Sequence, residues 1–394
     1  MTACAIETTA QDGDGAARRP EFTIASDGSY AARLAGEGEA LFPERWTLDG
    51  PEPYAVPLPL GQPEERDAQL LPLADGRVLI GRRVGGRCAF SLLYPTGPAT
   101  GEVPLGGVEA ESVRLLPPSP DGRSAYALAV GGRSTAIWQV AGGAFGPEHV
   151  AEVKGRCTGG VWLDRAGQLL ALDREFEGGG PVKAVAVDLG RGGEVTPLLQ
   201  ITEESHDRLL LADPDSGLLL IRSDAPSPGQ GRLGWGVLGS TRPVRFPESL
   251  RSAEAAVTPF AVQPGQVLMP ESCAVALRID GAAGSWVGVW RPASRRLVQL
   301  PAPEGWLCGT GLWTRDGVLL LPYATDAAPC GLARVEGAAD ALVPEAPAPA
   351  AARASAPAPE EPAGGEPSEG RRAPAVCRPV PLQQAPLTGR TAPG

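Results

Sequence analysis

The stretch SVRLLPPSPDGRSAYALAV, from Ser112 to Val130, decides the fold, because two apolar runs flank a tight turn that ends in glycine. The turn SPDGR supplies Asp-Gly, which places glycine where a hairpin needs a positive φ angle. The following residues predict two more strands, Ser134 to Val140 and Glu148 to Val153. The unit therefore consists of four short antiparallel strands.

The same device recurs along the chain at a nearly constant interval of 45 to 52 residues. Its turn glycines are Gly28, Gly76, Gly122, Gly167, Gly217, Gly265 and Gly317. This period is close to the roughly 40–50 residues of a four-stranded propeller blade. We therefore predict an all-β fold, a seven-bladed β-propeller of four-stranded antiparallel blades, over residues 20–343.

Some features modify the simple repeat. The predicted third strands carry large aromatic residues that we expect to pack between neighbouring blades, namely Trp46, Trp138, Trp235 and Trp290. Blade five has a Pro/Gly-rich loop, Ser223 to Gly234. Blade six has extra residues that we place around Pro270 to Gly284, and they indicate either an extended hairpin or a shifted register. Loops of this kind often carry binding sites.

The ends of the chain differ from the repeat. Residues 1–19 are predicted to form a flexible segment without the basic and apolar regions of a signal peptide. Residues 344–394 are rich in Pro, Ala and Glu and predict a disordered tail, which is a solubilising appendage or a docking segment. Phe22 to Ile24 open the first blade, but the sequence leaves open which segment closes the ring.

Charge and cysteine content restrict the partners. The formal net charge is -11, and five carboxylates balance five arginines after Val343, so the acidity belongs to the preceding residues. An acidic protein repels phosphate backbones and anionic lipid surfaces, so we expect neither nucleic acid nor membrane as a partner. The seven cysteines are scattered, which fits a reducing compartment. We expect a cytoplasmic monomer.

The repeat, above all SPDGR and its six weaker relatives, resembles the WD40/YVTN-like superfamily of bacterial propellers. The resemblance covers about Pro20 to Val343. It implies that fourth-to-first connections lie on the top face, at the mouth of a central channel. The Gly-His and Trp-Asp dipeptides of WD40 repeats are missing, so the resemblance assigns no functional residue.

Carboxylates precede several of the predicted inner strands, and the resemblance would place them at the channel mouth. They are Glu64, Glu65, Asp67, Glu109, Glu111, Glu203, Glu204, Asp207 and Glu254. Converging carboxylates raise each other's pKa or attract a cation. The pattern predicts a site for a basic protein partner or a cationic ligand, including Ca²⁺. The alternative is a solvated acidic rim.

The chain has two histidines, His149 and His206. His206 lies beside the acidic residues of blade five and is the best candidate for a general base, because imidazole titrates near neutrality. His149 is expected at the surface. Cys157 and Cys308 occupy matching positions in other blades and form either an incomplete metal cluster with His206 or, more simply, two small buried residues.

These observations favour a non-catalytic interaction scaffold that binds a protein partner through the acidic top face and the blade loops. One alternative is a metal-assisted hydrolase or lyase at the channel mouth, although a chain with no asparagine and two histidines is poor in the usual ligands. The other alternative is a small-ligand sensor. Apart from the Ca²⁺ alternative, the sequence indicates no cofactor.

Overall fold

The computed structural model describes residues 22–176, 178–294, 296–307 and 309–342. The predicted N-terminal segment and the predicted tail lie outside these ranges. The chain divides into two units, Met1–Pro344 and Glu345–Gly394, and all described residues belong to the first. No helix in the described ranges is both long and apolar enough to span a bilayer.

The strands follow one another in groups, which we number in chain order. Group one contains β1 (Phe22–Ile24), β2 (Tyr30–Ala35), β3 (Phe42–Thr47) and β4 (Tyr54–Pro57). Group two contains β5 (Gln69–Pro72), β6 (Val78–Val84), β7 (Arg87–Pro95) and β8 (Thr100–Glu109). Group three contains β9 (Ser112–Leu115), β10 (Ala125–Val130), β11 (Ser134–Ala141) and β12 (Glu148–Lys154). Group four contains β13 (Arg156–Trp162), β14 (Leu169–Glu175), β15 (Lys183–Asp188) and β16 (Glu194–Leu199). Group five contains β17 (Asp207–Ala212), β18 (Leu218–Ser223) and β19 (Arg232–Val237). Group six contains β20 (Ala256–Val262), β21 (Val275–Gly281), β22 (Gly284–Trp290) and β23 (Leu297–Pro301). Group seven contains β24 (Leu312–Trp313), β25 (Leu319–Tyr323) and β26 (Gly331–Val335).

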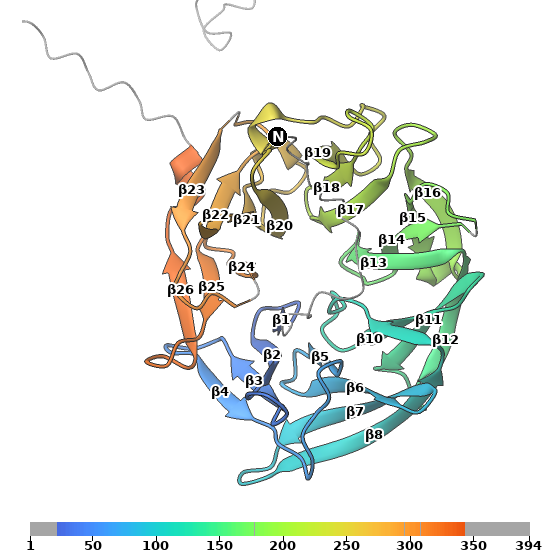
Figure 1. Cartoon of the computed structure of the whole chain (residues 1–394), viewed down its shortest axis with the longest axis vertical. Helices are drawn as coiled ribbons and strands as arrows, with labels where there is room; N and C mark the ends of the chain where they lie inside the picture. Colours follow the sequence, from blue (N-terminus) through green and yellow to red (C-terminus); the bar gives the residue numbers. More distant parts are fainter. Residues whose placement is uncertain (1–21, 177, 295, 308, 343–394) are drawn as a thin grey trace, which may run out of the picture. The chain divides into compact units, whose positions relative to one another are not determined.

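Hydrogen bonding joins these strands into antiparallel sheets that are arranged around a common centre (Figure 1). Groups four and five form one seven-stranded sheet, because β15 and β17 meet in a single parallel pair, Lys183 with Asp207. The first strand of each group lies toward the centre. The architecture is therefore a β-propeller, as the repeat predicted.

The predicted turn glycines all lie between the first and second strands of a group and all have positive φ angles, from 68° to 89°. In the third group, β9 pairs with β10 with Val113 opposite Ala129. These strands agree with the ones predicted from the quoted stretch. The register is fixed by the Asp-Gly turn, where the N–H of Gly122 donates to the carbonyl of Ser119 at 2.9 Å.

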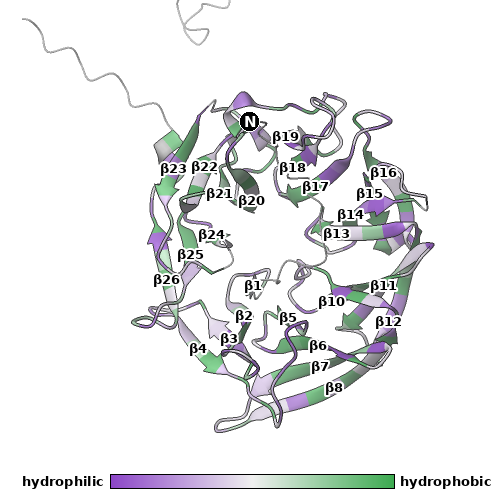
Figure 2. Cartoon of the chain, viewed as in Figure 1, coloured by the Kyte–Doolittle hydropathy of each residue, from purple (hydrophilic) through white to green (hydrophobic). Residues whose placement is uncertain are grey.

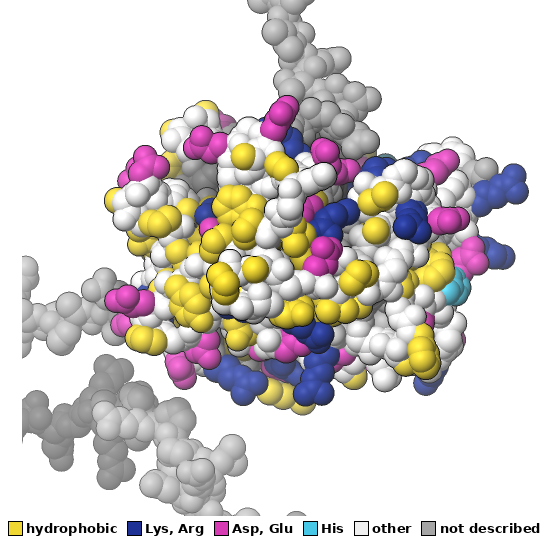
Figure 3. Space-filling model, turned by 90° about the horizontal axis from the view of Figure 1, so that it is seen from below, with side chains coloured by type: hydrophobic (Ala, Val, Ile, Leu, Met, Phe, Trp, Pro, Cys, Tyr) yellow, Lys and Arg dark blue, Asp and Glu magenta, His cyan; other side chains and the backbone are white. Residues whose placement is uncertain are grey.

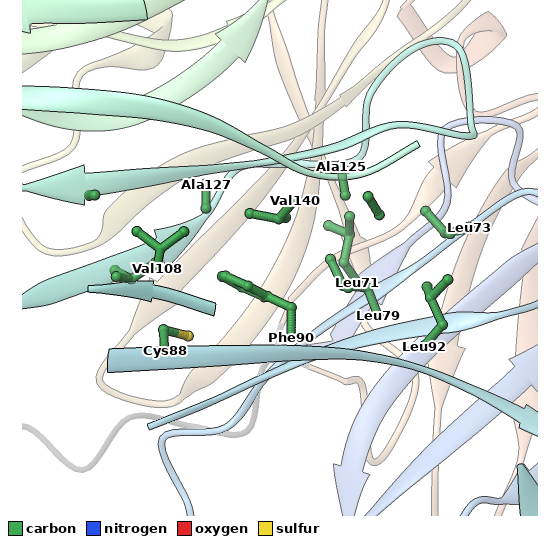
Figure 4. Packing of buried hydrophobic residues seen from close by; sticks show 13 residues of the cluster. Leu71, Leu73, Leu79, Cys88, Phe90, Leu92, Val108, Ala125, Ala127 and Val140 are labelled. Atoms are coloured by element: carbon green, nitrogen blue, oxygen red, sulfur yellow. The ribbon is translucent and has the colours of Figure 1, made fainter. Parts of the chain in front are cut away.

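Buried apolar residues fill the spaces between neighbouring groups, and Figure 2 shows hydrophobic residues concentrated on the strands. Between groups two and three, Leu71, Leu79 and Phe90 face Ala127 and Val140 (Figure 4). Comparable clusters lie between the other successive groups of the described part. The third-strand tryptophans pack between sheets, as predicted. Trp46, Trp235 and Trp290 are buried, and Trp138 is half-buried.

The first and last groups meet through apolar packing. Phe22 and Trp46 of group one contact Leu307 and Leu332 of the last group in one cluster. Within the described residues, β24, β25 and β26 form a sheet on their own, and no strand of another group pairs with them. Side-chain packing therefore joins the two ends of the described ring, while the segment before Phe22 lies outside the described residues.

The irregularity of group six differs in position from the prediction. We expected extra residues around Pro270 to Gly284, but β21 begins at Val275 and the hairpin turn falls between Gly281 and Gly284. The extra residues instead lengthen the first-to-second connection, which runs over residues 263–274. The sequence Val-Gln-Pro-Gly resembled a tight turn, whereas the chain continues into a short 3-10 helix, Pro270–Ser272, before it returns.

We expect Gly122→Ala to lower the free energy of unfolding more than Gly265→Ala. Both substitutions force an alanine into the left-handed region, at a cost of roughly 1 kcal/mol. A Cβ atom on Gly122 would lie 2.7 Å from the Cβ of Ala74 in the neighbouring turn, whereas a Cβ on Gly265 meets nothing within 4 Å. Chemical denaturation should show about 1 kcal/mol of additional loss for Gly122→Ala. Equal losses would show that contacts between turns do not restrain the ring.

Candidate functional site

The candidate site is the connection between β16 and β17, residues 200–206, which carries the predicted residues Glu203, Glu204 and His206. It closes around a buried ion pair between Lys183 Nζ and Asp207 Oδ2, which are 2.8 Å apart. Asp207 is fully buried and Lys183 is 9% exposed. These residues also form the parallel pair that joins β15 to β17. The loop is thus fixed at the junction of two strand groups.

Asp207 has its hydrogen-bonding capacity filled. Its carboxylate accepts from the hydroxyls of Ser223 at 2.6 Å and Ser205 at 2.9 Å, and from the N–H of Ile201 at 2.9 Å. We predicted that Asp207 contacts a ligand or partner, but its side chain has no access to solvent. The structure corrects this expectation: the sequence placed an acidic residue at the strand start, but did not show that Lys183 would cover it.

Lys183 completes the network from the opposite side. Its ammonium group donates to the carbonyl oxygens of Thr202 and Ser205 as well as to Asp207. The hydroxyl of Ser205 in turn accepts from the N–H of Thr202 at 3.2 Å. An isolated buried charge is very costly, so these contacts hold the backbone of the loop in one conformation around the pair.

The exposed residues of the loop include Glu203, Glu204 and His206. Two hydrogen bonds hold His206 in place. Its ring nitrogen Nδ1 accepts from the backbone N–H of Val182 at 3.2 Å, and its backbone N–H donates to Asp224 Oδ1 at 2.8 Å. Its other ring nitrogen is left as the group that a ligand could approach. The predicted general base thus has a defined orientation.

Arginines accompany the carboxylates of group two. Glu64 is 8% exposed and binds Arg82 through two contacts of 2.8 Å. Asp67 is half-exposed and lies 3.3 Å from Arg83, whose guanidinium also donates to the carbonyl of Glu111 at 3.1 Å. The predicted acidic cluster is therefore partly neutralised here, because β6 supplies two cations that its apolar start did not suggest.

The other predicted residues lie at the surface. Glu65 and Asp67 line a hollow of about 280 Å³, and Glu111 and Asp67 line a smaller one of about 70 Å³. Glu109 lies opposite Arg87 on neighbouring strands. Glu254 is exposed just before β20. The structure thus brings Glu65, Asp67 and Glu111 near Arg83, while Glu203 and Glu204 stand on a separate loop.

A hollow of about 560 Å³ lies among the inner strands β1, β5, β9, β13 and β20, and most of the residues that line it are apolar. Its polar lining includes Arg114 and Gln69 but none of the predicted carboxylates. In the described ranges, no three side chains from His, Cys, Asp and Glu come together in a way that could hold a metal ion. Cys157 is buried and Cys308 lies outside the described residues.

The buried thiols are unsuited to nucleophilic chemistry. Burial raises the pKa of Cys88, Cys157 and Cys273 to about 11. A thiol is a strong nucleophile only as thiolate, which is scarce at neutral pH for such values. We therefore assign these residues to the core.

Asp173 lies between groups four and five, next to the candidate loop. Burial raises the pKa of Asp173 from its ordinary value of 3.8 to about 6. The N–H of Leu209, which donates at 3.1 Å, and Arg208, at 3.7 Å, oppose this shift. Asp173 thus ties β14 to the inner strand β17. Sequence reasoning missed it because Asp173 begins the charged end, Asp-Arg-Glu, of the strand LLALDRE, and a charged strand end is expected to lie in solvent.

The charge seen from the rim in Figure 3 is mixed, because acidic and basic side chains alternate there with apolar ones. The exposed acidic residues that we predicted belong to connections between strand groups, except Glu109, which ends β8. Lys183 is the second residue that sequence reasoning missed. Its signal was available, since it is one of only two lysines and opens the otherwise apolar strand KAVAVD.

Comparisons with known proteins support the fold. No family model matches the sequence, and no curated protein matches it. Among solved structures, the β-propeller domain of the Trilobed protease from Pyrococcus furiosus, described as having an open velcro topology, is similar with a TM-score of 0.51 and 11% identity; the match covers 81% of this chain and 96% of that one.

Two peptidases are similar to the same extent. A puromycin-hydrolyzing peptidase from Mycobacterium tuberculosis has a TM-score of 0.51 and 17% identity, over 80% of this chain and 51% of its own. An acylaminoacyl peptidase has a TM-score of 0.52 and 11% identity, over 82% and 52%. The chain thus spans about half the length of the peptidases it matches. At these identities the likeness shows the fold alone.

We expect Lys183→Met and Asp207→Asn each to lower the free energy of unfolding by about 3–5 kcal/mol, because each leaves a buried group without its partner. The double substitution should cost less than the sum of the two. Amide hydrogen exchange should show faster exchange at residues 201–206 in the single variants. Additive losses, or unchanged exchange in the loop, would contradict the role assigned to the pair.

Asp173 gives a pH-dependent prediction. Because its pKa is raised on folding, its contribution to stability falls as pH rises from about 4 to about 6 and then stays constant. Asp173→Asn keeps an oxygen for the N–H of Leu209 but does not titrate. The free energy of unfolding of the wild type minus that of the variant should fall by about 3 kcal/mol over this range.

Asp215→Asn is the control of opposite sign for this measurement. The hydrogen bonds from Arg165 hold the pKa of Asp215 below its ordinary value, so the corresponding difference should rise with pH. A pH-independent difference for Asp173→Asn would show that burial does not shift that carboxyl.

Proposed function

We propose that this chain is a non-catalytic interaction propeller that binds a basic segment of a protein partner through Glu203 and Glu204, together with exposed carboxylates of other connections at the same ends of the strands. The observation that carries the proposal is the loop 200–206, which is fixed by a buried ion pair and yet presents two carboxylates to solvent. A loop held in one conformation loses little entropy when it binds.

The position of this loop supports the proposal. Connections from a fourth to a first strand emerge at the same ends of the strands in each group, since the strands are antiparallel. Glu65, Asp67, Glu111 and Glu254 belong to such connections, and all four are exposed. They extend the acidic surface beyond one loop, and complementary charge would speed the encounter with a basic partner.

We also propose that the ring has seven blades. The seven-stranded sheet counts as two blades, because a single parallel pair joins its halves. The described part contains an apolar cluster for each interface between successive groups and one more between the last group and the first. A location in the cytoplasm is consistent with four described cysteines, all free thiols.

A hydrolase-related role is the second candidate. The similar structures include peptidases, and the match to this chain covers about half the length of each. In that role this chain would serve as the propeller that accompanies a catalytic domain, without supplying catalytic groups itself. The buried, protonated thiols favour this arrangement over thiol catalysis within the propeller.

Affinity purification followed by equilibrium binding tests the proposal. We expect a stoichiometric protein partner whose affinity falls as salt is raised and drops about tenfold or more with Glu203→Gln/Glu204→Gln. The control Asp49→Asn/Glu52→Gln removes the same charge from the third-to-fourth connection of group one, at the other ends of the strands. Equal affinities for wild type and the Glu203/Glu204 variant would overturn the acidic interface.

A further inference from the structure

A second site lies at the opposite ends of the strands, between groups five and six. A hollow of about 400 Å³ is bounded by the first-to-second turn of group five, the residues after β19 and the inserted connection of group six. Its apolar lining includes Trp235, Val237 and Leu268. This volume is within the range of pockets that hold small organic ligands.

Two arginines give this hollow a positive wall. Arg242 and Arg245 line it and are exposed. The guanidinium of Arg245 lies 5.0 Å from the ring centre of Trp235, so a cation is held beside the apolar floor. Two backbone hydrogen bonds join Trp235 and Arg245: the N–H of Trp235 donates to the carbonyl of Arg245 at 2.9 Å, and the N–H of Arg245 donates to the carbonyl of Trp235 at 3.0 Å. The cation and the indole are therefore presented by a fixed backbone.

Two carboxylates also line the hollow. Asp215 is paired with Arg165 from the turn of group four, and Arg315 also lowers its pKa. Its charge is therefore already compensated. Glu271 is half-buried. With Arg242 and Arg245 on one side and Glu271 on the other, the wall keeps an excess of positive charge, in a protein whose formal net charge is -11.

The edge of the hollow is strained. Leu268 is the one described residue other than glycine with a positive φ angle, 55°. Its side chain is 83% exposed although it lines the hollow, and its N–H donates to the carbonyl of Asp215 at 3.2 Å. A branched residue in this conformation costs free energy, and strained residues of this kind cluster at ligand-binding and switch segments.

We propose that this hollow binds a small apolar anion, an aromatic or branched carboxylate or sulfonate. The anionic group pairs with Arg242 and Arg245, and the apolar part lies against Val237 and Leu268, which line the hollow. The inserted residues 263–274, which distinguish group six, close one side of the site. The site belongs to the end of the ring away from Glu203 and Glu204, so it is independent of the proposed protein interface.

The probe is 1-anilinonaphthalene-8-sulfonate, whose fluorescence rises when it is bound in apolar surroundings. We expect saturable binding with one probe per full-length chain and at least tenfold weaker binding of N-phenyl-1-naphthylamine, which lacks the sulfonate. 1-Naphthoate should displace the probe, whereas 1-naphthamide should not. Equal binding of the charged and uncharged probes would overturn the anion site.

Arg242→Gln/Arg245→Gln should weaken binding of the sulfonate probe at least about tenfold, because charge-assisted contacts are lost. Arg123→Gln/Arg334→Gln removes two exposed arginines elsewhere and should leave the affinity unchanged. Glu271→Gln should strengthen binding about two- to fivefold by removing a like charge. A loss of affinity in the Glu271 variant, or equal effects of the two arginine pairs, would contradict the proposal.

Leu268→Gly tests the strained edge separately. Glycine accepts the positive φ angle without a Cβ contact, so the melting temperature should stay constant or rise. Binding of the sulfonate probe should weaken about three- to tenfold because the apolar edge is removed. A variant that melts at a lower temperature, or one that binds the probe with wild-type affinity, would show that Leu268 serves the fold rather than the site.

Discussion

Burial of both faces of each sheet is the constraint on which the rest of this structure depends. On β6, Leu79 points into the cluster shared with group three, while Val78 and Ile80 point into the cluster shared with group one. A strand has a side-chain period of two, so such a sequence needs an apolar neighbour on each side. A row of sheets would leave two faces in water. The packing of Trp46 against Leu332 removes this problem within the described ring.

This burial also determines where polar groups are tolerated. Three side chains tie the inner strand of one group to the group before it, each through contacts to backbone or a charge. The amide of Gln69 spans β9, because it donates to the carbonyl of Val113 at 2.9 Å and accepts from the N–H of Leu115 at 2.7 Å. Asp173 accepts from Leu209, and Lys183 pairs with Asp207. These bonds orient adjacent sheets where apolar packing alone would permit sliding.

Sequence reasoning predicted the repeat well because its signals are local. An Asp-Gly or Pro-Gly turn and an alternating strand depend on residues close together in the chain. The candidate site depended on contacts between groups, which one sequence does not reveal. Glu64 looked like a free carboxylate until β6 placed Arg82 against it, and Asp207 looked accessible until β15 brought Lys183 over it. The extension of group six was detected by its length, but its position depended on where β21 began pairing.

Both proposed sites arise where the chain departs from the repeat, and in each the neighbouring group stabilises the departure. The loop 200–206 of group five is fixed by Lys183 of group four. The strained Leu268 of group six is held by the carbonyl of Asp215 in group five, and the carboxylate of Asp215 is bound in turn by Arg165 of group four. An irregular segment on a single sheet would relax toward solvent. In a closed ring each sheet has a rigid neighbour, so irregular connections can be kept in one conformation and can differ from group to group without disturbing the core.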